Sequence, residues 1–358
     1  MSTQAGGGPQ HVLTVALGLR ARGWRSIVAG PPGGVLFTRF RECGVETVAL
    51  RTDRVSALTV LRLVRAIRRH GVRLVHSHGK GAGLHARLAA RLAGVPAVHT
   101  LHGIHYERYP APARALYLAL ERRLSACTRV VINVSRAQEA EGLALHLFSA
   151  RQSRVILNGV DVARLTARAL DRWDARAELG LDPGVRVVGT AARFDAVKRL
   201  DLLLRALAAM PPPGAMLVLI GAGGEEQRLR ALSDELGLAG CVRFAGEMAE
   251  AARVFRAFDV FAAPSRKEGL PLAVVEAMAL GLPVVATDIP AHRETLGLSA
   301  GLVDGTVEAF AKGLVEVLDD ADLQLRLGGE NRTRARSEFD ARAMLTELES
   351  VYGDVLAV

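Results

Sequence analysis

The sequence predicts an α/β protein with two Rossmann-like domains, and three observations carry this prediction. Short β-branched runs alternate with longer helical patterns through nearly all of the 358 residues, as in parallel α/β sheets. The length suits two domains, each large enough to bury its own core. The composition, with 50% hydrophobic and 23% charged residues, is typical of a globular chain.

The expected strands fall into two sets. Those of the first half are residues 26–29, 46–50, 74–76, 97–101 and 130–134, and those of the second half are residues 185–191, 216–221, 242–245, 260–263, 283–286 and 301–303. We expect one domain over 1–157, a second over 158–340 and a terminal helix over 341–358. Because open parallel sheets bind ligands beyond the carboxyl ends of their strands, the two domains should face a cleft.

Composition excludes several classes of protein. No apolar run reaches the 18 residues of a membrane-spanning helix, and the first residues lack the pattern of a signal peptide. Cys43, Cys127 and Cys241 have no metal-binding or redox spacing. We therefore expect a cytoplasmic protein whose thiols stay reduced.

Charge is divided unequally along the chain. Residues 1–150 contain 21 Lys and Arg against 7 Asp and Glu, a balance of +14, whereas the remainder contains 25 basic and 30 acidic residues, a balance of −5. This asymmetry predicts that the first half meets an anionic surface. Nucleic acid is disfavoured, because only 4% of residues are aromatic and no nucleic-acid-binding motif is present. Anionic lipid fits better, and would bring the protein to the inner face of the plasma membrane.

A basic amphipathic helix is expected over residues 54–70. Its basic stripe is Arg62, Arg65 and Arg69, and its apolar stripe is Leu58, Leu61, Val64 and Ile67. One interpretation is a helix packed on its sheet with a solvated basic face. The other is a helix that docks on anionic lipid, where each Arg contributes about 1 kcal/mol. Arg122 and Arg123 would extend such a patch.

The most informative segment is residues 265–277, in which seven residues separate Glu268 from Glu276. Gly269, Leu270 and Pro271 form a turn between them, and Pro271 suits the first position of a helix. The N–H groups of the next residues, among them Leu272, then favour an anion. Carboxylates bind sugar hydroxyls through charge-assisted hydrogen bonds. The alternative is two unrelated surface glutamates.

Further segments extend this pattern over the whole chain. They include a glycine run at 6–8, His76-Ser-His78, His99 to Gly103, Asn158 to Asp161, Gly189 to Lys198, and Gly281 to Asp288. Together with Glu268 and Glu276 they resemble the retaining glycosyltransferases of family four, the glycosyl transferases group 1 of GT-B fold. The resemblance covers nearly the whole chain, in order and at the usual spacings.

This resemblance implies roles for individual residues. Glu276 would bind the ribose, Glu268 the transferred sugar, and His102 the donor sugar near its reacting carbon. Arg193 and Lys198 would neutralise the leaving phosphate, so no metal and no cofactor are expected. The other expected donor contacts are Gly7, Gly8, Gly223, Arg243, Gly269, Leu270 and Leu272.

The chain also departs from the family pattern. Ala192 and Arg199 stand where glycine is usual, and Arg199 either crowds the phosphate or adds a third cation. The chain begins inside the glycine loop, without the apolar strand that normally precedes it. We expect either that the start of translation lies further upstream, which is the favoured explanation, or that the first domain lacks its central strand.

The sequence disfavours two other chemistries. The histidines His76, His78, His99, His102 and His105 have spacings that suggest zinc, but positions at strand ends should splay them apart. Residues 221–224 form half of a dinucleotide fingerprint, but no acidic residue ends the following strand, which disfavours a nicotinamide enzyme.

The sequence therefore predicts a retaining, metal-independent hexosyltransferase. Its expected donor is a UDP- or GDP-linked sugar, and its expected acceptor is a lipid-linked or saccharide intermediate of surface polysaccharide or glycolipid synthesis. The alternatives are a sugar-nucleotide epimerase or phosphorylase of the same fold, or an inactive subunit that binds nucleotide sugar.

Overall fold

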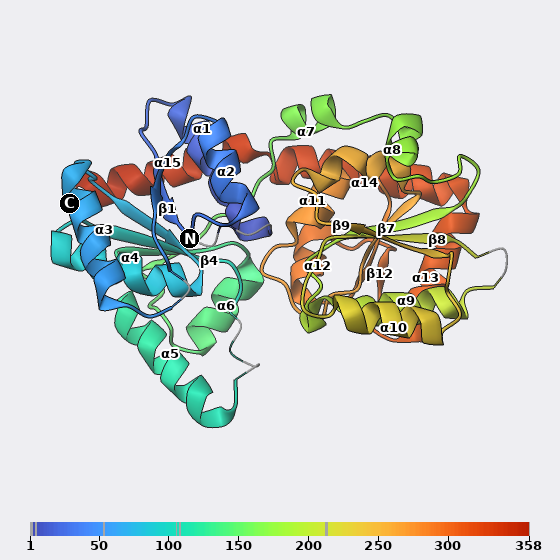
Figure 1. The fold of residues 1–358 in the computed structure, drawn as a ribbon, viewed down its shortest axis with the longest axis horizontal. Coiled ribbons are helices and arrows are strands. Elements are labelled where there is room, and N and C mark those ends of the chain that lie inside the picture. The colour runs from blue at the N-terminus through green and yellow to red at the C-terminus, as the bar shows by residue number, and fades with distance from the viewer. Residues whose placement is uncertain are drawn as a thin grey trace. The chain divides into compact units, whose positions relative to one another are not determined.

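The computed structural model describes residues 3, 6–52, 54–104, 106, 109–211 and 214–357. The chain forms two compact units (Figure 1). Unit 1 consists of Met1–Asn158 with Ala341–Val358, and unit 2 of Gly159–Asp340. Each unit has a parallel sheet and its own buried core, and each is described by itself.

Unit 2 is built on a six-stranded parallel sheet in the order β12-β11-β10-β7-β8-β9. Its strands are β7 (Val187–Ala191), β8 (Met216–Ile220), β9 (Val242–Gly246), β10 (Val260–Ala263), β11 (Val284–Thr287) and β12 (Leu302–Val303). Every strand expected in this half is present. The inner strands are buried on both faces, which explains why they are continuous apolar runs.

Helices cover both faces of this sheet (Figure 1). One face carries α9 (Leu200–Ala209), α10 (Glu226–Glu235) and α13 (Val307–Asp319), and the other carries α11 (Leu272–Ala279) and α14 (Ala321–Glu338). The shorter elements are α7 (Val162–Arg168), α8 (Arg172–Glu178), α12 (Pro290–Leu296), η1 (Ala196–Lys198) and η2 (Ala251–Ala257). This layering leaves the carboxyl edge of the sheet to its loops.

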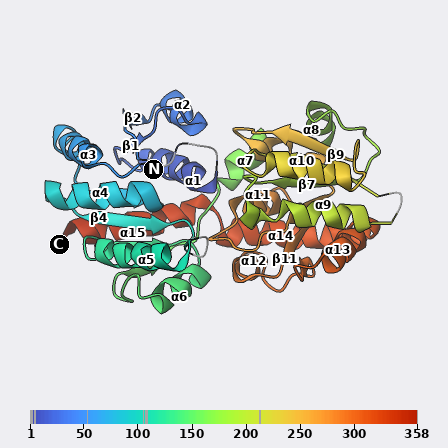
Figure 2. The ribbon, with the colours of Figure 1, turned by 60° about the horizontal axis from the view of Figure 1, so that its bottom comes forward.

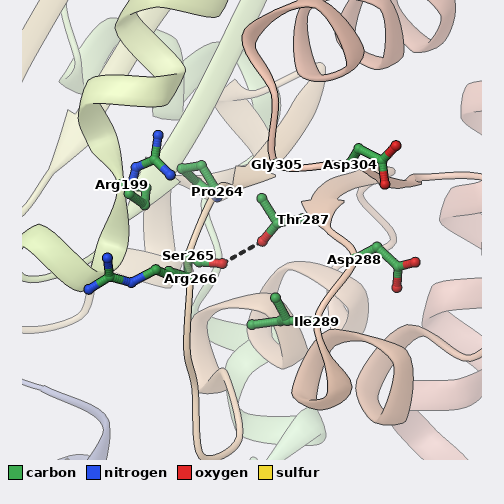
Figure 3. A pocket seen from close by; sticks show the side chains of 9 residues that line it. All are labelled: Arg199, Pro264, Ser265, Arg266, Thr287, Asp288, Ile289, Asp304 and Gly305. Carbon is green, nitrogen blue, oxygen red and sulfur yellow. Dashed lines mark hydrogen bonds between the residues drawn. The ribbon is translucent and has the colours of Figure 1, made fainter. Parts of the chain in front are cut away.

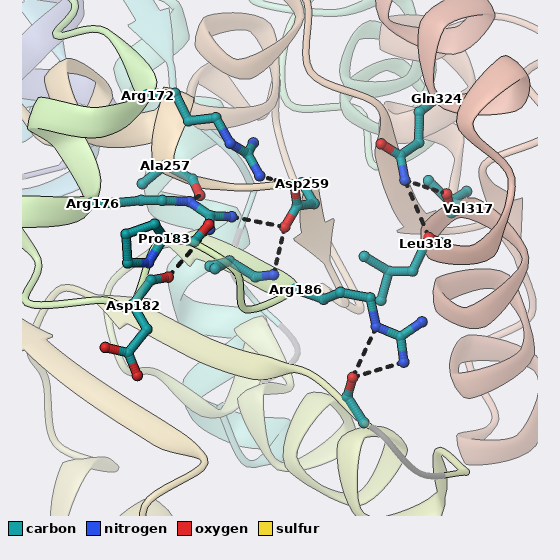
Figure 4. Close-up of polar contacts among 12 residues, drawn as sticks. Arg172, Arg176, Asp182, Pro183, Arg186, Ala257, Asp259, Val317, Leu318 and Gln324 are labelled. Atoms are coloured by element: carbon teal, nitrogen blue, oxygen red, sulfur yellow. Dashed lines mark hydrogen bonds and ion pairs between the residues drawn. The ribbon is translucent and has the colours of Figure 1, made fainter.

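A largely shielded carboxylate, with 14% of its side chain exposed, ties the first helices of unit 2 to its sheet. Asp259, just before β10, accepts hydrogen bonds from Arg172 (2.6 Å), from Arg176 (3.0 Å) and from the backbone N–H of Val187 (2.7 Å) (Figure 4). The Arg176 side chain is only 1% exposed and also donates to the carbonyl of Ala257. Since a buried guanidinium needs this compensation, Asp259 fixes α8 against β7 and β10.

The strands of unit 1 form two separate sheets. β3 (Val75–His78), β4 (Ala97–Leu101), β5 (Val130–Asn133) and β6 (Ser153–Val155) form a four-stranded parallel sheet, and β1 (Ile27–Gly30) pairs with β2 (Glu46–Ala49). Within the described residues, no strand joins β1 to β3. The expected lack of a central strand stays a prediction. β6 was not expected, because three residues are too short to show a period.

Helices of unit 1 lie on both faces of these sheets (Figure 2). They are α1 (Gly7–Arg20), α2 (Val35–Glu42), α3 (Ala57–Arg69), α4 (Lys80–Ala93), α5 (Ala111–Ser125), α6 (Arg136–Ala144) and the terminal α15 (Ala341–Ala357). α15 packs with α1 against Val98 and Ile132 of the sheet. A Cβ atom at Gly18 would lie 2.2 Å from the Leu345 side chain, which would have to shift for any larger residue.

Three details differ from the sequence expectations. α1 begins at Gly7 rather than near Gln10, and Pro271 is the N-cap of α11 rather than its first residue. On α3 the buried side chains are Leu63, Val64 and Ile67, whereas Leu58 and Leu61 are about half exposed. The expected apolar stripe was therefore wrong in its first half. In the part of the chain that is described, no helix has both the length and the hydropathy needed to cross a bilayer.

Asp259→Ala should destabilise the protein strongly. The change leaves the buried guanidinium of Arg176 without its carboxylate, which typically costs about 3–5 kcal/mol. Urea unfolding measures this loss directly. The control is Glu226→Ala, which removes an exposed partner of Arg230 and should change the free energy of unfolding by less than about 1 kcal/mol. Equal effects of the two changes would show that Asp259 has no special role.

Candidate functional site

An ion pair joins the two loops that follow β7 and β10 in unit 2. Lys198 Nζ lies 2.6 Å from Glu268 Oε1, and Ser265 Oγ donates to the same oxygen at 2.7 Å. The side chains of Lys198 and Glu268 are 21% and 12% exposed, so water screens the pair only partly. The structure thus brings together two of the four predicted catalytic residues.

Backbone contacts hold these loops in place. The N–H of Arg266 donates to the carbonyl of Val197 at 2.9 Å, which links the loop after β10 to the loop after β7. Thr287 Oγ1 donates to the carbonyl of Ser265 at 2.5 Å, which links it to the end of β11 (Figure 3). Because neighbouring parallel strands end at the same edge, three loops distant in sequence converge here.

The two predicted glutamates have opposite electrostatic surroundings. Burial alone would raise the pKa of Glu268, but Lys198 and the hydrogen bonds from Lys198 and Ser265 outweigh it and hold the pKa below its usual value. Glu276, on α11, has no such partner, and burial raises its pKa to about 7. The pair therefore offers one fixed carboxylate and one that titrates near neutral pH.

His292 is a further member of this site that the sequence interpretation missed. It is buried on α12, where its Nδ1 lies 2.7 Å from the carbonyl of Thr287, and its Nε2 has no hydrogen-bond partner. Burial lowers the pKa of His292, while the charge of Glu268 acts to raise it. The available signal was that this is the single histidine after residue 150.

Arg193 and Arg199 do not join the ion pair. Arg193 is exposed and pairs with Asp195 at 2.7 Å. Arg199 adopts a left-handed backbone conformation, with φ of 51°, and its Nε lies 3.2 Å from Asp201. The positive φ explains why glycine suits this position. Arg199 lines a cavity of about 130 Å³ at the carboxyl ends of β10, β11 and β12, together with Arg266 (Figure 3).

The remaining predicted donor contacts of unit 2 lie in different parts of the unit. Gly223 follows β8, and a Cβ atom there would lie 2.6 Å from the carbonyl oxygen of Phe194, so the glycine allows two loops to pack. Gly269, Leu270 and Leu272 are buried around the start of α11. Arg243 is the second residue of β9 and its guanidinium lies over Gly180. The structure therefore keeps Arg243 away from the carboxyl edge, contrary to the expected base contact.

The histidines of unit 1 converge rather than splay. His78, at the end of β3, and His102, after β4, place Nδ1 and Nε2 3.1 Å apart, and His11 of α1 packs against both rings. The prediction that strand ends separate these side chains was wrong, because adjacent parallel strands bring them side by side. Gly8 also lies here: a Cβ atom on it would sit 3.5 Å from the His102 ring.

His76 and His99 are held by other partners. His76 contacts the Tyr352 hydroxyl at 2.5 Å and the Thr100 hydroxyl at 2.7 Å, and His99 Nδ1 lies 2.8 Å from Ser77 Oγ. Burial lowers the pKa of His76 to about 3 and that of His102 to about 4. Both are therefore neutral at physiological pH. The predicted His105 lies outside the described residues.

Comparison with known proteins identifies the family. The family model of glycosyl transferases group 1 matches residues 171–334, and that of glycosyltransferase family 4 matches residues 5–164. A D-inositol 3-phosphate glycosyltransferase of Corynebacterium jeikeium is 33% identical over 307 residues, which cover 79% of this chain and 72% of that protein. This chain belongs to glycosyltransferase family 4. The enzyme of the same name from Stackebrandtia nassauensis is 32% identical, over 79% and 68% of the two chains.

Solved structures confirm the predicted fold class. The crystal structure of HepE from Anabaena in complex with UDP and glucose aligns with a TM-score of 0.87 at 23% identity, over 99% of this chain and 98% of that chain. The family 4 chain thus has the GT-B type of fold, with two Rossmann-like domains. The predicted activity is confirmed at the level of a glycosyltransferase.

Glu276→Gln should stabilise the unliganded protein at pH 8 but not at pH 5. Folding raises the pKa of this carboxyl from 4.5 to about 7, so its stability contribution is complete below the lower value and is lost as pH rises through the higher one. A neutral amide avoids the loss. Thermal unfolding at the two pH values tests this, with the exposed Glu316→Gln as control. An equal gain at both pH values would contradict the buried-carboxyl interpretation.

Proposed function

We propose that this family 4 protein is a retaining glycosyltransferase that moves a hexose from a UDP- or GDP-linked sugar to a lipid-linked or saccharide acceptor. Unit 2 would bind the donor and unit 1 the acceptor. The observation that carries the proposal is the Lys198–Glu268 ion pair at the carboxyl edge of the unit 2 sheet. It places a cation for a phosphate and a carboxylate for sugar hydroxyls on adjoining loops.

The proposed donor site uses three contacts. Lys198 would donate a hydrogen bond to the leaving phosphate. An ammonium group has three N–H donors, so Lys198 can keep its contact with Glu268 and also bind a phosphate oxygen. Glu268 would accept from hydroxyls of the sugar, and Glu276 from the ribose. The first amides of α11, at Leu272 and Ala273, precede its helical hydrogen bonds and suit a phosphate oxygen. The HepE structure contains UDP and glucose, which supports a nucleotide-sugar donor for this chain.

Transfer would proceed on one face of the sugar. The bond from the anomeric carbon to the diphosphate oxygen breaks, the acceptor oxygen bonds to that carbon from the same side, and the acceptor's proton passes to the leaving phosphate. Lys198, Arg193 and the start of α11 would stabilise the developing negative charge. Charge stabilisation by these groups makes a metal ion unnecessary for the step.

The proposed acceptor class rests on the net charge of the first half of the chain and on the exposed side chains of α3. Residues 1–150 have a net charge of +14, against −5 for the remainder, and on α3 Leu58 and Leu61 are exposed beside Arg62 and Arg65. Exposed apolar side chains among arginines suit the interface of an anionic bilayer. We therefore place the enzyme on the inner face of the plasma membrane, in surface polysaccharide or glycolipid synthesis. The relatives named for D-inositol 3-phosphate suggest an anionic soluble acceptor as the rival.

Sugar transfer should survive EDTA and depend on Lys198. Lys198→Ala should lower kcat by ~10²–10³, whereas chelation should leave the rate within about twofold. The assay offers UDP- and GDP-sugars with D-inositol 3-phosphate and with polyprenyl-linked saccharides as acceptors. Lys312→Ala, at an exposed lysine, is the control and should be silent.

Three outcomes would count against parts of this proposal. Activity that EDTA abolishes and Mn²⁺ restores would refute metal independence. Nucleotide that stabilises the protein in a thermal shift, with no transfer to any acceptor, would favour an inactive binding subunit. An inverted anomeric configuration in the product would refute retention.

The exposed face of α3 should bind anionic membranes. Changing Arg62, Arg65 and Arg69 to Gln removes three contacts of about 1 kcal/mol each and should weaken partitioning roughly a hundredfold. Co-sedimentation with phosphatidylglycerol vesicles measures this, with neutral vesicles alongside. The matched control changes Arg228, Arg230 and Arg326, which are exposed helix residues of unit 2. If both variants lose the same amount of vesicle binding, the net charge of the protein rather than the face of α3 determines binding.

A further inference from the structure

Three histidines from three elements meet inside unit 1, with His11 buried and the other two largely shielded. His11 comes from α1, His78 from the end of β3 and His102 from the loop after β4. One ring nitrogen of each lies within 4.8 Å of those of the other two, and the His78 and His102 nitrogens are 3.1 Å apart. We propose that these three imidazoles form a binding site for a divalent transition-metal ion of the Zn²⁺ or Co²⁺ class.

The state of His11 is the independent observation for this site. The residue is only 3% exposed, and neither of its ring nitrogens has a hydrogen-bond partner. A buried polar group without a partner costs about 1–3 kcal/mol, so native proteins seldom retain one without a reason. A metal ion between His11, His78 and His102 would satisfy His11 and would replace the close contact of the other two rings with two coordinate bonds.

The chemistry of the donor set selects the class of ion. All three ligands are imidazoles, which suit Zn²⁺, Co²⁺, Ni²⁺ and Cu²⁺, whereas Mg²⁺ and Ca²⁺ require oxygen ligands. Burial keeps the pKa of each imidazole below its usual value, so a lone pair is available at neutral pH. Three histidines leave a fourth position for water or an anion. Within the described residues, no other group of potential ligands is as closely spaced.

Neighbouring groups hold the rings that would coordinate the ion. The ring of His76 packs on that of His78 at 4.1 Å between centroids, and His76 is itself fixed by Tyr352 and Thr100. The backbone of Gly8 lies against the His102 ring, where a Cβ atom would be in van der Waals contact with it at 3.5 Å. Such restraint lowers the entropy that ligands lose when they bind a metal.

The ion would act as an inhibitor rather than as a cofactor. This consequence, unlike the metal site itself, rests on the proposed function, in which His102 contacts the donor sugar. An ion bound to His102 would occupy the ring nitrogen that the contact with the donor sugar requires. Submillimolar Zn²⁺ should therefore slow sugar transfer, and EDTA should restore the rate.

Cobalt titration of the untagged, full-length protein tests the site without any substrate. After dialysis against EDTA and removal of the chelator, Co²⁺ should produce the visible d–d absorption of a four-coordinate ion and saturate at one equivalent. Added Zn²⁺ should abolish the band. A spectrum that stays that of hexaaquacobalt would overturn the proposal.

Two variants assign the signal to these residues. His11→Phe keeps a buried ring, removes both unpaired nitrogens and should lose the cobalt band without lowering Tm; His78→Ala should also lose it. His146→Asn is the matched control, because His146 is exposed at a positive φ that Asn tolerates. A band that persists unchanged in both His11→Phe and His78→Ala would overturn the assignment. Cobalt binding without Zn²⁺ inhibition would leave the site intact and count against the role of His102 in transfer.

Discussion

The contact between Lys198 and Glu268 is the interaction on which the candidate donor site depends. It joins two loops that leave the same edge of the sheet from the neighbouring strands β7 and β10. Because both side chains are mostly shielded from water, each needs the other, and losing either would leave a poorly solvated charge. The pair therefore fixes the distance between the loops before any ligand arrives, which is the kind of preorganisation that catalysis by charge stabilisation requires.

Backbone geometry sets a second constraint beside this pair. The chain turns from η1 directly into α9, and the residue between them has a left-handed conformation that costs a side-chain-bearing residue about 1 kcal/mol. Here that residue is Arg199, which is held by Asp201. The departure from glycine that the sequence revealed thus leaves the turn intact. It adds a guanidinium to the wall of the nearby cavity, next to Arg266, rather than to the Lys198–Glu268 pair.

The sequence predicted those features that follow from the periodic spacing of residues. Apolar runs such as Met216–Ile220 identified the strands, and the spacing of Glu268 and Glu276 identified the loop and helix that hold them. The same reasoning failed for features that tertiary contacts determine. Leu58 was assigned to the buried face of α3 because residues 58, 61, 64 and 67 recur at every third position. At 3.6 residues per turn this spacing drifts around the helix, so Leu58 lies on the side opposite Ile67, and Leu63 occupies the buried face instead. Convergence of His78 with His102 depends on strand order, which spacing along one chain does not encode.

The two glutamates show why spacing predicts proximity but not chemistry. Glu268 and Glu276 are the same residue type on one short segment, yet their pKa values move in opposite directions. The difference comes from Lys198, 70 positions before Glu268 in the sequence, which reaches the first carboxylate and not the second. A buried carboxyl without a cation needs hydrogen-bond donors when it is charged, and in the proposed donor site the ribose hydroxyls would supply them to Glu276. The loop end of the segment therefore carries a carboxylate that the protein itself stabilises, and the helix end carries a carboxyl whose protonation depends on its surroundings.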